Sequence, residues 1–319
     1  MMPNKKRDDY VDIAKGLCII LIVVIHSEVM GYLGMVKYTY FAVPLFFYMS
    51  GFYDKSELSW KDCIKKAFLT VLTPAIIWLS IGIVYKGLLS FCKSGVLGFH
   101  IDLYGPTLDN GPIWFLFALF VAKLMTLLFI KCKIPVILQL IVSIVIGLAG
   151  MKTNLPLHLD EGMSAMPLYL LGKHSYEHIK CIINNKWLIA LGIISLLLFY
   201  GGLLIYTIVP KMNYSLIVLL IVSCIAVISF VPILWTCLKL DKIQWLQKVG
   251  KQSLGIMLTH ALLCHTFAVI VNRLFAVGSF PWIIISLISF IAVCFISYYL
   301  SLLISKYCPI LFGKKAYKK

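Results

Sequence analysis

The segment WLIALGIISLLLFYGGLLIYTIV, residues 187 to 209, decides the fold class of this chain. A second segment, residues 280 to 305, is equally apolar. Each is long enough to cross a hydrocarbon core of about 30 Å as a helix that rises about 1.5 Å per residue. Hydrophobic residues make up 61% of the 319 positions and charged residues only 13%, whereas about a quarter of a soluble domain is charged. We therefore predict an all-α, polytopic membrane protein.

The hydropathy pattern predicts ten transmembrane helices. Shorter segments that carry Lys residues and turn-forming residues separate the apolar blocks. We find no separable soluble block and no fixed-period repeat, so we expect residues 1–319 to form a single membrane domain. The predicted helices lie at roughly 11–30, 36–53, 67–92, 113–130, 134–151, 164–182, 187–209, 214–237, 252–272 and 280–305.

The placement of basic residues predicts the orientation of the chain. The formal net charge is +16, but the Lys residues lie between apolar blocks and not on one face of a folded domain, so we expect no nucleic-acid partner. With ten spans and a cytoplasmic N-terminus, most of the 29 Lys and Arg residues fall in cytoplasmic segments. We therefore expect both ends of this multi-pass chain in the cytoplasm, with the lipid bilayer as a partner.

The ten Cys residues give no sign of a metal or disulfide framework. They occur singly, mostly within apolar blocks, with no C-x-x-C pair and no Cys/His cluster at the spacing of metal ligands. We expect no metal site.

The stretch DIAKGLCIILIVVIHS, residues 12 to 27 of the first predicted helix, carries the three ionisable residues Asp12, Lys15 and His26. A charged group at membrane depth is costly, so each one is a candidate for function. Lys15 and His26 are close to three helical turns apart and lie on one face, with Asp12 one turn before Lys15. Interfacial anchoring explains Asp12 and Lys15 equally well. His26 is the stronger candidate, because imidazole exchanges protons near neutral pH.

Other polar or helix-breaking residues allow two interpretations each. Pro44 and Gly51 either interrupt the second helix beside a cavity or mark a kink with close packing. Lys65 and Lys66 precede the third apolar block, where they could bind a cytosolic anion or serve only as positive-inside residues. Trp114 fits an interfacial aromatic belt.

Two histidines lie in the predicted ninth helix. His260 is about midway along it and His265 five residues further. Either could face a cavity, or could hydrogen-bond a neighbouring helix as a structural residue.

Taken together, several separated segments resemble acyltransferase family 3, the membrane-bound acyltransferases that modify bacterial surface glycans and related molecules. The segments occur in the order expected for the family and together span nearly the whole chain. The segments are the Lys15 to His26 arrangement, VPLFFYMSGFY from Val43, the Lys65–Lys66 pair before an apolar run ending at Pro74, WFLFALF from Trp114, and GKQSLGIMLTH ending at His260.

The resemblance implies a ten-helix enzyme of a bacterial cell membrane that transfers an acyl group, usually acetyl, from cytoplasmic acyl-CoA. The acceptor would be a hydroxyl of a carbohydrate or glycolipid, and acyl-CoA would be a substrate, with no bound cofactor. His26 would be the catalytic histidine, either as general base or as transient acyl carrier. The other site residues implied are Lys15 and Asp12 beside His26, Lys65 and Lys66 for the CoA phosphates, and Ser50, Trp114 and His260 for substrate.

Two departures from the family pattern concern positive charge. Members often carry Arg residues just after the Lys pair, where this chain has Ala67 and Thr70. Lys15 also stands where Arg is commoner, and a Lys offers a point charge in place of a planar fork. How this chain binds CoA is therefore open at the level of sequence.

Other classes of membrane protein fit the sequence less well. A transporter or flippase of a lipid-linked sugar would also have many helices and buried polar residues, but we find no inverted repeat and few buried acidic groups. A glycan polymerase would need large external loops with Arg clusters, and Arg273 is the only external Arg predicted. A structural or sensory protein leaves the alignment of Lys15 with His26 unexplained. We therefore predict an O-acyltransferase, most simply an acetyltransferase, of surface polysaccharide.

Overall fold

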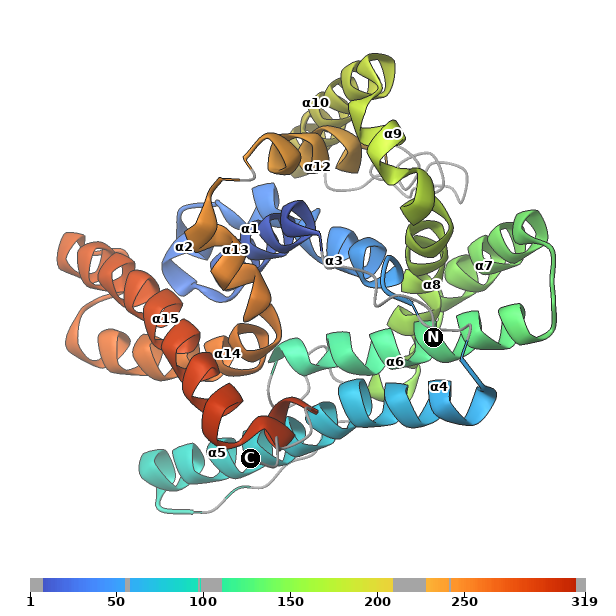
Figure 1. Ribbon diagram of the computed structural model, residues 1–319. Helices are drawn as coiled ribbons and strands as arrows, with labels where there is room; N and C mark the ends of the chain where they lie inside the picture. The colour runs from blue at the N-terminus through green and yellow to red at the C-terminus, as the bar shows by residue number, and fades with distance from the viewer. Residues whose placement is uncertain are drawn as a thin grey trace.

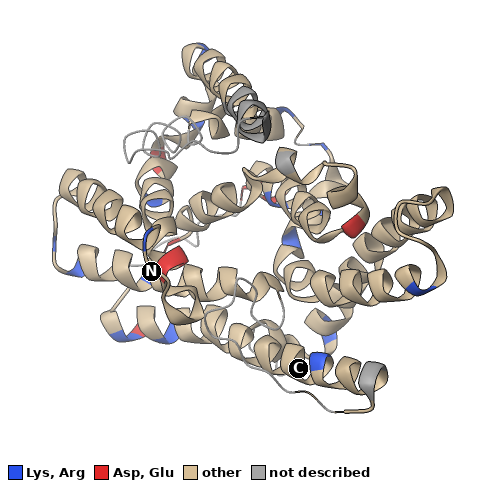
Figure 2. Cartoon of the chain, turned by 180° about the vertical axis from the view of Figure 1, so that it is seen from behind, with Lys and Arg blue, Asp and Glu red and all other residues tan. Residues whose placement is uncertain are grey.

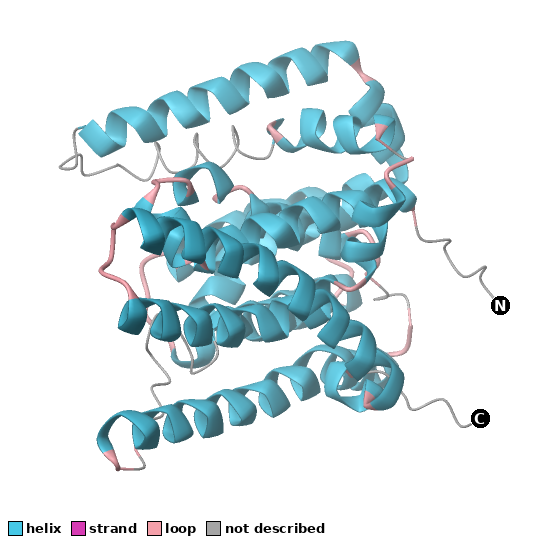
Figure 3. Cartoon of the chain, turned by 90° about the vertical axis from the view of Figure 1, so that its left-hand side faces the viewer, coloured by secondary structure: helices cyan, strands magenta, loops and turns pink. Residues whose placement is uncertain are grey.

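The computed structural model describes residues 8–54, 58–96, 98, 111–208, 228–240 and 242–313. Regular structure within these residues is entirely helical, with no strand (Figure 3). The all-α fold predicted from composition is confirmed.

The longer helices account for most of the described chain. In order they are α1 (Asp9–His26), α2 (Glu28–Tyr32), α3 (Ala42–Gly51), α4 (Trp60–Ala67), α5 (Thr73–Ser94), α6 (Trp114–Lys131), α7 (Val136–Gly150), α8 (Leu159–Ser175), α9 (Ile179–Asn184), α10 (Lys186–Ile208), α12 (Phe230–Lys239), α13 (Gln244–Lys251), α14 (Ser253–Leu274) and α15 (Phe280–Tyr307). Short helical turns join them at η1 (Val36–Thr39), η2 (Phe68–Leu72), η3 (Gly111–Ile113), η4 (Pro156–His158), η5 (Tyr176–His178) and η6 (Pro309–Phe312).

The helices wrap around a central pair. In Figure 1, α1 and α3 lie in the middle, with α13, α14 and α15 on one side and α6 and α8 on the other. Helix α7 packs outside α8, and α10 packs on α12. Figure 2 shows Lys and Arg mainly at helix ends and in connections, which leaves most helix surfaces uncharged.

Four helices among the described residues are long and apolar enough to cross a membrane. They are Trp60–Cys92, Gly111–Lys131, Ser253–Leu274 and Phe280–Tyr307. The number rises to five if Pro156–Asn184 and Lys186–Leu198, which meet at 94°, count as one bent span. Helices α3, α7 and α12 are apolar but shorter. These apolar helices fit a membrane protein. The number of ten spans and the orientation of the chain ends stay predictions. Of the predicted span 214–237, residues 214–227 lie outside the described residues.

The first predicted span, 11–30, is two helices in the structure. Ser27 takes an extended backbone conformation (φ −86°, ψ 120°), and α2 begins directly after it. A helical hydrogen-bond ladder cannot continue through an extended residue. His26 is therefore the last residue of α1 and lies at a helix break.

The third predicted span begins earlier than the hydropathy suggested. The chain is helical without interruption from Trp60 to Ser94, through α4, a π-helical turn and α5. Pro74 explains the wide turn, because it has no N–H to donate to the carbonyl of Thr70 four residues earlier. Lys65 and Lys66 consequently lie on a helix and not in a loop.

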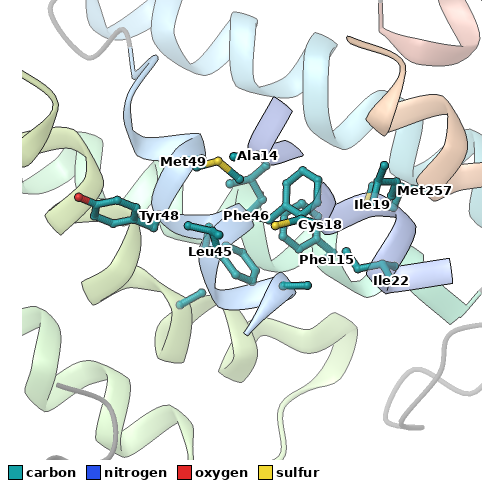
Figure 4. Close-up of a cluster of buried hydrophobic side chains, with 14 of the residues drawn as sticks. Ala14, Cys18, Ile19, Ile22, Leu45, Phe46, Tyr48, Met49, Phe115 and Met257 are labelled. Atoms are coloured by element: carbon teal, nitrogen blue, oxygen red, sulfur yellow. The ribbon is translucent and has the colours of Figure 1, made fainter. Parts of the chain in front are cut away.

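The core lies where α1 and α3 meet α6 and α14. Cys18 and Ile22 of α1, Phe46 of α3, Phe115 of α6 and Met257 of α14 are all buried there (Figure 4). The rings of Phe46 and Phe115 lie with their centroids 6.0 Å apart. This packing fixes the position of α1, which carries His26.

Helices α3 and α8 touch backbone to backbone. A Cβ atom on Gly51 would collide with the Tyr169 carbonyl, and one on Gly172 would collide with the Tyr48 carbonyl. Small residues permit such close approach of apolar helices. Of the two interpretations of Gly51, the structure supports close packing; Pro44 lies in the first turn of α3, where proline is tolerated.

Candidate active site

Two histidines from opposite ends of the sequence meet in the structure. The rings of His26, at the end of α1, and His260, within α14, have centroids 5.1 Å apart and planes inclined by 62°. The pairing depends on the packing of α1 against α14. His260, which the sequence left between two interpretations, is thus in contact with the strongest candidate residue.

The hydrogen bonding of His260 sets its tautomer. Its Nδ1 lies 2.8 Å from the carbonyl oxygen of Ile256. A carbonyl can only accept, so Nδ1 carries the proton and Nε2 of the neutral ring presents a lone pair. His260 is fully buried, and Nε2 has no hydrogen-bond partner among the described residues. An acceptor nitrogen is therefore available in the immediate surroundings of His26.

A cavity of about 760 Å³ opens beside His26. Gly111 of η3 lies against the His26 ring, since a Cβ placed on it would be 3.6 Å from Cε1. The size and the mixture of aromatic and polar walls are typical of small-molecule sites. Besides His26 and Ser27, the polar and aromatic lining includes Glu28, Tyr32, Tyr85, Lys86, His265 and Asn272, from α2, α5 and α14.

The opposite end of α1 carries the second polar region. Lys15 Nζ lies 5.2 Å from the centre of the Tyr53 ring. Tyr53 also lines a small cavity of about 50 Å³, together with Asp54, Lys66 and Lys123. Eleven residues of helix separate Lys15 from His26, which corresponds to about 16 Å. The two cavities thus lie toward opposite ends of α1.

Positive charge dominates this second region. Asp54 accepts from Lys173 Nζ at 2.8 Å and from the Tyr169 hydroxyl at 2.6 Å. Lys123 Nζ lies 5.6 Å from the centre of the Tyr169 ring. Asp54 is the single acidic residue among those that line this cavity, whereas Lys66 and Lys123 line it too and Lys173 pairs with Asp54, so the region is suited to an anion.

Similarity to known proteins is found at the level of the family. The profile of acyltransferase family 3, described as an acyltransferase domain, matches residues 8–301. The chain belongs to acyltransferase family 3. No curated protein and no solved structure gives a match. The family resemblance drawn from the motifs is thereby confirmed, and the protein is an acyltransferase.

In this acyltransferase, the remaining motif residues line neither cavity. Asp12 is fully buried, and its carbonyl packs against Gly250 of α13. The hydroxyl of Ser50 donates to the Phe46 carbonyl within α3, at 2.7 Å. Their roles in catalysis and substrate binding stay predictions, as does that of Lys15.

Two further predicted residues also lie outside the cavities of the acyltransferase. The Trp114 ring packs against Phe115 and against His158, with centroids 6.3 Å and 5.8 Å apart. Lys65 is exposed on α4, whereas its neighbour Lys66 lines the smaller cavity. Of the predicted CoA-binding pair, only Lys66 lines this cavity, together with Asp54 and Lys123.

Three residues that line the two cavities were missed in the sequence. Lys123 and Glu28 lie within predicted spans, so the rule that ionisable residues in a span are functional candidates could have found them. Asn272 gave no signal, because an amide near a helix end is unremarkable. Among the described residues, no group of three His, Cys, Asp or Glu side chains is arranged to hold a metal ion.

Proposed function

We propose that this acyltransferase is a membrane-embedded O-acetyltransferase that moves the acetyl group of cytoplasmic acetyl-CoA to a hydroxyl of a cell-surface carbohydrate. The contact of His26, on the wall of the larger cavity, with the buried His260 is the observation that supports it. A base held by a second group is the usual arrangement for activating a hydroxyl. The cavity volume also suits a sugar unit.

The chemistry needs only the two histidines and the substrates. In the proposed reaction the His26 ring turns so that its N–H donates to His260 Nε2, the acceptor nitrogen with no other partner among the described residues, and the other His26 nitrogen faces the acceptor hydroxyl. As the hydroxyl oxygen attacks the thioester carbonyl, His26 takes its proton. The C–S bond then breaks, and the CoA thiolate leaves with the proton returned by His26. This scheme uses His26 as general base; the alternative, a transient acetyl-histidine, uses the same residue as nucleophile.

The donor is proposed to enter from the Lys15 end of α1. Lys66 and Lys123 bind CoA phosphates there, because ammonium groups pair with phosphate oxygens as compact point charges. Family members often carry Arg residues after the Lys pair, where this chain has Ala67 and Thr70. In this chain Lys123 of α6 supplies a positive charge to the region instead. The pantetheine arm then extends along α1 for the distance of about 16 Å to His26.

The proposed orientation of the protein in the membrane follows from what lies at the two ends of α1. The lysine-rich end lies at the cytoplasm, where acyl-CoA is found, and the His26 cavity opens on the outer side of a bacterial cell membrane, where the acceptor is found. Helix α1 begins and α15 ends on the same side of the bundle, where Figure 3 marks N and C. That arrangement supports an even number of crossings.

Transfer of radiolabel from acetyl-CoA to surface glycan tests the proposal. Membranes would carry wild type, His26→Ala or His178→Ala at matched expression; His178 is exposed on η5 and lines neither cavity. We expect label with wild type and His178→Ala and none with His26→Ala. Label unaffected by His26→Ala would refute the catalytic role of His26. No label with any form would favour a transporter or flippase of a lipid-linked sugar.

A further inference from the structure

The short helix α2 presents a carboxylate and an aromatic ring to the larger cavity. Glu28 and Tyr32 are four residues apart, so they lie on the same face of α2. Both line the cavity that contains His26. Glu28 is exposed, and only the extended residue Ser27 separates it from His26.

A chain of hydrogen bonds from buried structure fixes the Glu28 carboxylate. Asn272 of α14 donates from Nδ2 to both carboxylate oxygens, at 3.0 Å each. The Asn272 carbonyl oxygen accepts in turn from Trp282 Nε1 of α15, at 2.7 Å. Trp282 is fully buried. Since the indole can only donate, it fixes the flip of the amide and therefore the direction in which Asn272 donates.

Tyr32 is held by the same hairpin of helices. Its ring meets the edge of Trp282, with centroids 5.3 Å apart. Its hydroxyl lies against Gly278, where a Cβ would come within 2.8 Å of the oxygen. Gly278 has φ +81°, a conformation that favours glycine. The turn between α14 and α15 thus positions both Glu28 and Tyr32.

We infer that Glu28 and Tyr32 form the recognition site for the acceptor, and that the acceptor presents a sugar ring with neighbouring hydroxyls. The inference rests on the function proposed above. A carboxylate only accepts, and sugar hydroxyls donate, so a fixed carboxylate selects adjacent hydroxyls through charge-assisted bonds. An aromatic ring beside it offers apolar area to the C–H face of the sugar. Asn272 and Trp282 are positioning residues, because they act through Glu28.

Kinetics with the protein in membranes test the recognition site. The acceptor in the assay is surface glycan from the cells that produce this protein, treated with alkali to remove existing esters. Radiolabelled acetyl-CoA is the donor. Glu28→Gln keeps the shape and removes the charge. We expect it to raise the apparent KM for glycan at least about tenfold and to leave the KM for acetyl-CoA unchanged. Arg273→Gln, which removes a charge beside Asn272 on the same helix, serves as the control and should match wild type.

Trp282→Phe separates positioning from packing. It removes the donor to Asn272 and keeps an aromatic ring, so the KM for glycan should rise less than with Glu28→Gln. An unchanged KM for glycan in Glu28→Gln, or equal rises for glycan and acetyl-CoA, would overturn the inference.

Direct binding separates this inference from the proposed function. The treated glycan would be titrated against the full-length protein in lipid nanodiscs without acetyl-CoA. Binding by wild type that weakens at least about tenfold in Glu28→Gln would support the recognition site even if no acetyl group is transferred. Absence of binding by wild type, or equal binding by the two forms, would refute it.

Discussion

Lys173 of α8 and Asp54, which follows α3, form a largely buried ion pair with Nζ and Oδ1 2.8 Å apart. The Tyr169 hydroxyl donates to the other carboxylate oxygen. The pair therefore joins the end of α3 to α8 at the level of the smaller cavity, close to where α3 and α8 touch through glycines. Both side chains are mostly hidden from solvent, with exposures of 14% for Lys173 and 8% for Asp54.

Breaking this pair on one side should destabilise the protein. Lys173→Met removes the ammonium group that pairs with the buried Asp54 carboxylate, and the loss of one partner of a buried ion pair costs about 3 kcal/mol. We expect a lower midpoint of thermal unfolding in detergent, followed by the loss of monodisperse protein. The double variant Asp54→Asn with Lys173→Met should recover part of the loss, because no charge is then left unpaired. Equal midpoints for Lys173→Met and wild type would contradict the structural role of the pair.

The contact between α3 and α8 should tolerate no larger side chain at its centre. Gly172→Val places branched atoms against the Tyr48 carbonyl and forces the helices apart. We expect a strongly reduced yield of folded protein, measured by size-exclusion chromatography after solubilisation. Gly31→Val is the matched control, since no atom lies within 4 Å of a Cβ built there. A normal yield of Gly172→Val would show that the two backbones are further apart than described.

His260 should affect turnover more than donor binding. His260→Phe keeps a ring in contact with His26 and removes the acceptor nitrogen. If His260 orients His26, kcat for acetyl transfer should fall about a hundredfold, while the KM for acetyl-CoA stays within about twofold. The control is His178→Phe, on the surface at η5. A kcat like that of wild type would leave His260 with a packing role only.

Lys123 should control the affinity for the donor. Lys123→Met keeps the length of the side chain and removes the charge, so the KM for acetyl-CoA should rise about tenfold with little change in the KM for glycan. The rise should shrink at high ionic strength, because screening weakens the wild-type interaction. Lys61→Met, on the exposed surface of α4, provides the comparison. Equal donor affinity in Lys123→Met and wild type would exclude Lys123 from the donor site.

Hydrophobicity and helical period are local properties of the sequence. They were sufficient to predict the fold class and to single out His26 as a candidate functional residue. Apolar blocks the length of a membrane crossing predicted a helical membrane protein, and the spacing of Lys15 and His26 placed them on one face of α1. Ordered motifs indicated the family, and the family profile agrees. The break at Ser27 was invisible, because the apolar run continues through it and the extended conformation is imposed by packing.

The sequence by itself therefore determined that this chain is a helical membrane acyltransferase with a candidate catalytic histidine within its first predicted helix. Only the tertiary structure decided that His260 is the partner of His26, that Lys123 joins Lys66, and that Asn272 holds Glu28. Each of these pairs joins different helices. Periodicity fixes which face of a helix a residue occupies, whereas the neighbour that this face meets depends on how the glycines and large side chains of the whole bundle pack.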